Sequence, residues 1–139
     1  MGGDFAPKAT IAGALLALQE LDGAHSVQLV GQTRVIEAEL DKLVAGEYSG
    51  AASSRRRISI IEAPEIIEMS EKPTAGLRKK PNSSMVVGIK MQVDNKSDAF
   101  VSAGNTGAQM ATSAMLLKLQ PGLTRPAIAT AAPRVPDSA

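Results

Sequence analysis

One short run of the sequence combines glycines with small polar side chains, residue types that can bind an anion at a turn of the backbone. The run is Ser102-Ala103-Gly104-Asn105-Thr106-Gly107. Glycine lets the chain turn tightly, and the start of a following helix presents unpaired N–H groups to an anion. The run lacks the GxGxxG spacing and the Gly-Lys-Ser/Thr ending of nucleotide-binding loops, so it specifies neither a dinucleotide nor a nucleoside triphosphate. An ordinary capped turn between a strand and a helix stays open as the alternative.

A second junction of a glycine loop with a helix stands at the start of the sequence, Met1-Gly2-Gly3-Asp4, followed by Pro7 and Lys8. The two glycines would allow another segment or a ligand to approach the backbone closely, and Asp4 could cap the helix. A lysine in a first helical turn opposes the helix dipole, so Lys8 is a candidate anion contact. A solvated lysine is the alternative reading.

Composition excludes several other kinds of site. The sequence has 139 residues, no cysteine, one histidine (His25), 2% aromatic residues and a formal net charge of +1. Disulfides, thiolate zinc sites and a cysteine nucleophile are therefore excluded, and base-stacking platforms or a nucleic-acid stripe are not supported. The glutamates at 62, 65, 68 and 71 are too evenly scattered to define a metal site. Lys72, Lys79 and Lys80 could contact an acidic carrier protein, or simply face water.

The expected elements alternate between helix and strand. Apolar spacing and capping residues predict helices over 8–21, 34–45, 83–93 and 106–119, with possible caps at Thr33, Ser83 and at Asn105 or Thr106. Short apolar runs predict strands over 26–30, 58–62, 99–102 and 127–130, a loop over 46–57 and an irregular stretch over 63–81. The buried stripes of the first two helices are predicted to be Ile11, Leu15 and Leu18, then Ile36, Leu40, Leu43 and Val44.

Strands that are apolar on both faces predict a mostly parallel sheet with helices on both faces, in a single α/β domain over residues 1–139. Ligands bind such sheets at the carboxyl ends of the strands, where the run at 102–107 should lie. No apolar run reaches the roughly 18–20 residues that cross a bilayer, so we expect a globular, cytoplasmic protein.

Several motifs, in order along nearly the whole sequence, resemble the phosphate acyltransferases of bacterial phospholipid synthesis, the PlsX family. The matching stretches are residues 1–8, Ile67-Glu68-Met69, Glu71-Lys72-Pro73, Lys80, Ser83-Ser84-Met85, residues 98–108 and residues 125–130. Family members carry a strand directly before the Met-Gly-Gly-Asp motif, and the sequence leaves the family pattern near Ala131. We therefore expect the sequence to be the N-terminal portion of a longer protein, and its fold to be incomplete.

The resemblance implies an enzyme that moves a fatty acyl group from acyl carrier protein to inorganic phosphate, giving acyl phosphate. It also implies a Rossmann-like three-layer α/β fold, related to isocitrate dehydrogenases and phosphotransacetylases. A homodimer, peripheral association with the inner face of the cell membrane, no metal or nucleotide cofactor and no nucleic acid partner are expected as well. By the same resemblance, the phosphate-binding residues are expected in the two glycine loops: Gly2, Gly3, Asp4, Lys8, Ser102, Gly104, Asn105, Thr106 and Gly107.

Two alternatives to this interpretation remain. A phosphotransacetylase-type enzyme would use short-chain acyl-CoA in place of a long-chain acyl carrier protein. A truncated, non-catalytic chain or a module that only binds carrier protein is the rival from another class, because the sequence contains no self-sufficient catalytic constellation.

Overall fold

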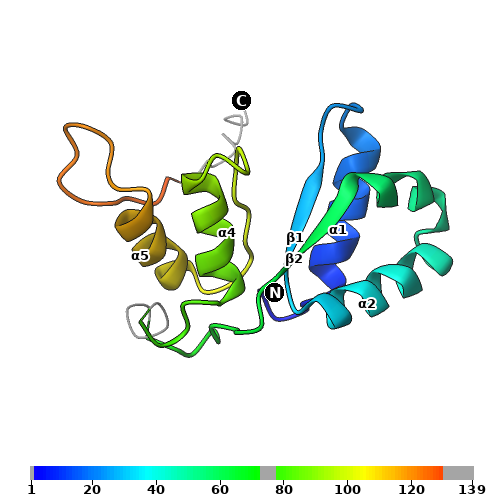
Figure 1. The fold of residues 1–139 in the computed structure, drawn as a ribbon, viewed down its shortest axis with the longest axis horizontal. Coiled ribbons are helices and arrows are strands. Elements are labelled where there is room, and N and C mark those ends of the chain that lie inside the picture. The colour runs from blue at the N-terminus through cyan, green and yellow to red at the C-terminus, as the bar shows by residue number, and fades with distance from the viewer. Residues whose placement is uncertain (1, 73–77, 130–139) are drawn as a thin grey trace, which may run out of the picture.

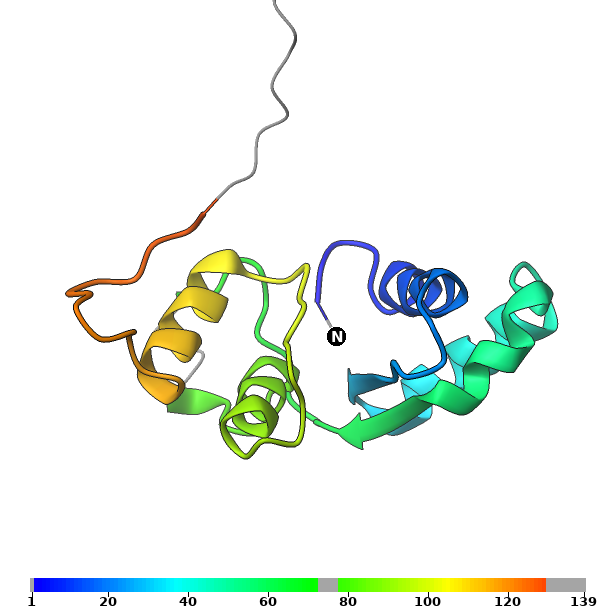
Figure 2. The same ribbon diagram turned by 90° about the horizontal axis from the view of Figure 1, so that it is seen from above.

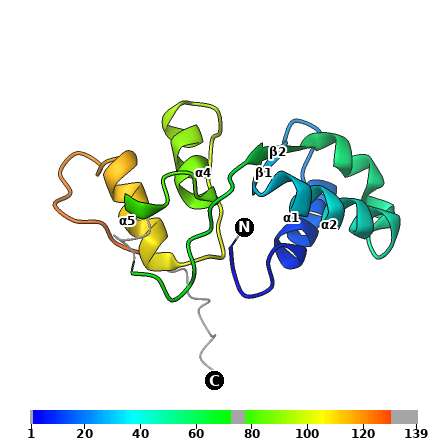
Figure 3. The ribbon, with the colours of Figure 1, turned by 60° about the horizontal axis from the view of Figure 1, so that its bottom comes forward.

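The computed structural model describes residues 2–72 and 78–129 and places two groups of elements one after the other along the chain (Figure 1). The first group contains two helices, a 3₁₀-helix and two strands: α1 (Lys8–Glu20), β1 (Val27–Gly31), α2 (Thr33–Ala45), η1 (Ser49–Arg57) and β2 (Ile58–Glu62). The second group contains α4 (Ser84–Val93) and α5 (Thr106–Leu116). The N-terminal loop lies between the two groups (Figures 2 and 3).

Strands β1 and β2 form a parallel pair, which confirms both of these strand predictions and the α/β class. The register runs from Val27 opposite Ile58 to Gly31 opposite Glu62. The ladder continues for one further bond, since the Ala63 N–H donates to the Gly31 carbonyl at 2.9 Å. These two strands are the whole sheet within the described residues.

The apolar stripes of α1 and α2 pack on these strands and build the larger core. Ile11, Leu15 and Leu18 are buried on α1, and the predicted stripe of α2 is buried except for Val44, which is partly covered. Leu29 and Ile58 of the two strands belong to the same cluster. The residues that a helical period of 3.6 predicted to face inward are therefore buried in this core. Among the described residues, no helix has the length and apolar character needed to cross a membrane.

The stretch between α2 and β2 is a 3₁₀-helix in its longer part, and the prediction of a plain loop over 46–57 was wrong. Side chains three residues apart share a face of a 3₁₀-helix, and here the small residues Ala51 and Ser54 are the buried pair. At the end of η1, the Arg57 guanidinium donates to the carbonyls of Leu21, Asp22 and His25. This arginine therefore ties the turn after α1 to the start of β2.

Helix α2 begins one residue earlier than predicted, and its cap comes from the neighbouring strand. Thr33 is the first helical residue, and its N–H donates to the Glu62 carboxylate at 3.0 Å. Hydrogen bonds from Thr33, from its side chain first and then from its N–H, hold the pKa of Glu62 below its ordinary value. Helix α2 is thus joined at its start to the end of β2.

The second group has a smaller core, between α4 and α5. Four residues form its buried cluster: Ile67, Met85, Ile89 and Ala108. The Phe100 ring packs against Gly88 of α4, so closely that a Cβ there would lie 2.3 Å from a ring carbon. The predicted cap position of α4 is correct, although the buried Ser83 hydroxyl bonds to no group among the described residues.

Two predicted strands are not formed. Residues 99–102 are irregular chain anchored by Phe100. A strand requires a hydrogen-bonding neighbour, and within the described residues the ladder contains only β1 and β2. Residues 127–129 are also irregular, and Thr130 lies outside the described residues. Helix α5 ends at Leu116 instead of 119, since Lys118 turns the chain into the left-handed region with φ 66°.

Candidate functional site

Three segments that are far apart in the sequence meet at a cleft of about 170 Å³. They are the N-terminal loop, the stretch that follows β2, and the loop that precedes α5. The lining residues are Gly2, Gly3, Ala6, Ile66, Ile67, Glu68, Met69 and Gly104. The two glycine loops singled out from the sequence therefore do come together, at the junction between the two groups of elements.

Glycine is required where these two loops touch. A Cβ on Gly2 would lie 3.1 Å from both Cα and N of Gly104. Gly3 has φ +95°, a left-handed conformation, and a Cβ there would lie 3.1 Å from the Ala103 carbonyl oxygen. A larger residue at either position would push the N-terminal loop away and open the cleft.

The loop before α5 is ordered by its own polar side chains. The Ser102 hydroxyl accepts the Gly104 N–H at 3.1 Å, and the Asn105 side-chain oxygen accepts the Ala108 N–H at 2.9 Å, capping the helix. The N–H groups of Thr106 and Gly107, in the first turn, have no acceptor among the described residues. The helix start that follows Gly104 thus carries free donors and the positive end of a dipole.

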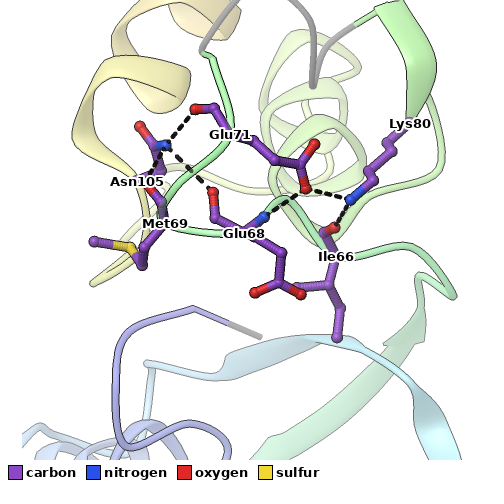
Figure 4. Close-up of polar contacts among 6 residues, drawn as sticks. All are labelled: Ile66, Glu68, Met69, Glu71, Lys80 and Asn105. Carbon is purple, nitrogen blue, oxygen red and sulfur yellow. Dashed lines mark hydrogen bonds and ion pairs between the residues drawn. The ribbon is translucent and has the colours of Figure 1, made fainter.

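The opposite wall of the cleft, residues 66–69, is held from behind by Asn105 (Figure 4). Asn105 is buried, and its side-chain amide donates to the carbonyls of Met69 at 3.1 Å, Glu71 at 3.0 Å and Glu68 at 3.4 Å. One side chain therefore both caps α5 and ties a distant segment to it.

A half-buried ion pair completes this arrangement. The Glu71 carboxylate accepts the Glu68 N–H at 2.9 Å and a bond from the Lys80 ammonium, which also donates to the Ile66 carbonyl at 2.6 Å (Figure 4). The Glu68 N–H first, and then Lys80, hold the pKa of Glu71 below its ordinary value. The Lys80 ammonium is therefore engaged within the fold, whereas the sequence predicted either contact with an acidic carrier protein or an exposed side chain.

The residues predicted to bind phosphate differ in how close the structure places them to the cleft. Gly2, Gly3 and Gly104 line the cleft, and Ser102, Thr106 and Gly107 belong to the loop and helix start beside it. The Asn105 amide is occupied by three backbone carbonyls. Asp4 is exposed and is not among the lining residues.

Lys8 is turned to a different partner. Its ammonium lies 3.1 Å from the Glu47 carboxylate, on an exposed surface, and Glu47 raises the pKa of Lys8 above its ordinary value. Lys8 is also absent from the cleft lining. In this structure Lys8 therefore joins the start of α1 to the stretch after α2.

The wall at 66–69 and the pair formed by Glu71 and Lys80 were not predicted as site residues. Their stretch is broken by prolines and carries no helical or strand period, so spacing gave no indication of its position. The sequence did carry one indication that these residues matter. Ile67-Glu68-Met69, Glu71 and Lys80 all belong to the stretches that resemble the phosphate acyltransferases.

A model of the family described as "Fatty acid synthesis protein" matches residues 1–139. The chain belongs to this family. Among its relatives is the phosphate acyltransferase of Salinibacter ruber, 46% identical over 93% of this chain and 36% of that protein. The phosphate acyltransferases of Pseudomonas fluorescens (44% identical) and Desulforamulus reducens (47% identical) each align with 96% of this chain and 37% of their own length.

This member of the fatty acid synthesis protein family thus spans little more than a third of the length of the curated relatives it matches. Within that span, both glycine loops and the wall at 66–69 are present and line the same cleft. An anion that fits the cleft would meet glycine backbone on one side, and Ile66, Ile67, Glu68 and Met69 on the other.

Proposed function

We propose that the protein is a phosphate acyltransferase that moves a fatty acyl group from acyl carrier protein to inorganic phosphate. The observation that carries this proposal is the cleft where Gly2 and Gly3 approach Gly104, next to the free N–H groups at the start of α5. Helix starts with free donors favour phosphate-like anions. The shared family with proteins named phosphate acyltransferase supports the same activity.

The reaction requires little chemistry from side chains. A phosphate oxygen attacks the thioester carbonyl carbon, and the tetrahedral intermediate expels the carrier thiolate, which takes up the proton released by phosphate. Phosphate is itself the nucleophile, so the protein has to hold it near the carbonyl and offset the developing negative charge. In this proposal the N–H groups of Thr106 and Gly107, with the Ser102 hydroxyl, supply the donors that hold phosphate.

The wider expectations belong to the same proposal. They are a three-layer, Rossmann-like fold with helices on both faces of the sheet, a homodimer, a cytoplasmic location with peripheral contact to the membrane, and acyl carrier protein as the partner. The parallel pair of β1 and β2 supports the fold part of this proposal.

The test is an assay of the natural full-length protein with long-chain acyl carrier protein and phosphate, detecting acyl phosphate. In that protein Gly104→Val is expected to raise the KM for phosphate by at least about tenfold, because a Cβ on Gly104 would already lie 3.2 Å from the Ser102 hydroxyl and 3.5 Å from the Gly2 Cα, so valine would displace both and distort the cleft. The KM for the acyl donor should change less than about twofold. Gly13→Ala is the matched control, since a Cβ on Gly13 meets nothing within 4 Å.

Three results would contradict the proposal or its site. Transfer from short-chain acyl-CoA without carrier protein would favour the phosphotransacetylase-type alternative. Binding of carrier protein without formation of acyl phosphate would favour the non-catalytic alternative. An unchanged KM for phosphate in Gly104→Val would show that this cleft is not the phosphate site.

A further inference from the structure

The Glu68 carboxylate is the one ionisable side chain among the described residues that line the cleft. Its side chain extends toward the N-terminal loop (Figure 4). Glu68 is exposed, and no ion pair or hydrogen bond engages its carboxylate among the described residues. The group is therefore free to meet a ligand that enters between the two walls.

The backbone on both sides of this carboxylate is fixed. The Glu68 N–H donates to Glu71, and the Glu68 carbonyl accepts the Asn105 amide at 3.4 Å. Lys80 holds Glu71 in place and also binds the Ile66 carbonyl. Both peptide groups of Glu68 are thus tied, so the point from which its side chain projects is fixed, and only the side-chain rotamers remain to be ordered when a ligand binds.

A carboxylate in this cleft would discriminate between anions that carry a proton and anions that do not. Lys, Arg and His are absent from the described lining residues, so no side-chain cation there would offset repulsion between Glu68 and a bound anion. Two negative oxygens at hydrogen-bond distance are stable when a proton lies between them. Such a proton belongs to hydrogen phosphate, which carries a P–OH group at neutral pH, whereas sulfate of the same shape carries none.

We propose that Glu68 is a specificity-determining residue that accepts a hydrogen bond from the P–OH group of the bound phosphate and repels fully deprotonated oxyanions. The inference rests on the proposed function, because it assumes that phosphate occupies this cleft. Asn105, Glu71 and Lys80 act through Glu68 as positioning residues. The donors at the start of α5 would hold the remaining phosphate oxygens.

The experiment compares phosphate with sulfate in the natural full-length protein and in Glu68→Gln. The readouts are the KM for phosphate and the inhibition constant of sulfate as a competitor of phosphate. Glutamine keeps the size of the side chain, removes the repulsion and adds an N–H donor that a sulfate oxygen accepts. We expect the preference for phosphate over sulfate to fall by about tenfold or more in Glu68→Gln, as for the loss of a hydrogen bond to a charged group.

Glu37→Gln is the matched control, an exposed carboxylate on α2 outside the cleft lining, and it should leave the preference unchanged. Glu68→Ala provides a second variant, with weaker phosphate use and the same lost discrimination expected. Phosphate dependence that is intact in all variants, with an unchanged preference over sulfate, would overturn the role of Glu68 alone. A wild-type protein with no saturable use of phosphate would overturn the proposed function, and this inference with it.

Discussion

The two groups of elements are held together by different kinds of contact. Residues 8–62 share one apolar cluster of ten buried residues, contributed by two helices, η1 and two strands, whereas the second group buries four residues in its cluster. The first group can therefore rely on apolar burial. The loops of the second group rely more on directed hydrogen bonds, which Asn105 and Lys80 donate and the Glu71 carboxylate accepts.

This difference matches the position of the cleft. Its walls at 66–69 and at Gly104 belong to the second group, and the Gly2–Gly3 loop joins them from the start of the first. Apolar burial is non-directional and does not by itself orient an irregular loop. Hydrogen bonds to successive carbonyls do fix a loop, because each one has a preferred distance and angle. The comparison implies that the first group carries stability and the second carries the geometry of the site.

The largest expected effect tests the first half of this comparison. Leu40 of α2 is fully buried in the larger cluster. Leu40→Ala should lower the free energy of unfolding by about 2–5 kcal/mol, because it removes buried methyl groups and leaves a cavity. Urea denaturation followed by helical circular dichroism measures this change. Leu16→Ala, at a residue 46% exposed on α1, is the control and should cost much less.

A smaller and more local effect tests the second half. Asn105→Ala removes both the cap of α5 and the bonds to three carbonyls, with an expected loss of about 2 kcal/mol. Asn105→Asp keeps an acceptor for the Ala108 N–H but places a negative oxygen against those carbonyls. In Asn105→Asp, hydrogen exchange should therefore speed up in 66–72 and stay unchanged in α5. Equal exchange in wild type and Asn105→Asp would show that another contact holds the wall.

Much of the first group could be predicted from the sequence, because its elements follow local periodicity. The stripe of Ile11, Leu15 and Leu18 and the strands near 26–30 and 58–62 all follow from apolar spacing. The 3₁₀-helix was missed because small polar residues such as Ser49 and Gly50 carry no apolar period. The cap of α2 was misassigned because its acceptor, Glu62, is 29 residues away in sequence.

The second group was less predictable, because long-range contacts decide its local structure. Residues 99–102 have the composition of a strand, but Phe100 anchors them on Gly88 in place of a ladder. The two glycine loops of the site were found from residue type alone. The opposing wall was not, since its position depends on the bonds that Asn105 donates to carbonyls 34 to 37 residues earlier.

The smallest expected effect compares how the two groups respond to acid. Glu62 has a lowered pKa because it accepts hydrogen bonds from Thr33, from the side chain first and then from the N–H. Glu71 has a lowered pKa because it accepts the Glu68 N–H first and then a bond from Lys80. A lowered pKa in the folded state means that the carboxylate stabilises that state above its ordinary pKa of about 4.3, and that this stabilisation is lost as the pH falls through the lowered value. The amide signals of Thr33 and Glu68 should therefore both titrate in nuclear magnetic resonance spectra.

The consequences of the two titrations should differ. Thr33 starts a helix whose apolar face is buried in the larger cluster, so protonation of Glu62 should leave the amides of α2 protected from exchange. Protonation of Glu71 removes the negative charge that strengthens its bonds to the Glu68 N–H and to Lys80, so protection over 66–71 should fall in the same pH range. Glu71→Gln should abolish the titration of the Glu68 amide and leave that of Thr33 intact. If α2 and residues 66–71 lost protection from hydrogen exchange over the same pH range, both groups would depend equally on their carboxylates. The contrast between a region held by apolar packing and a region held by hydrogen bonds would then be wrong.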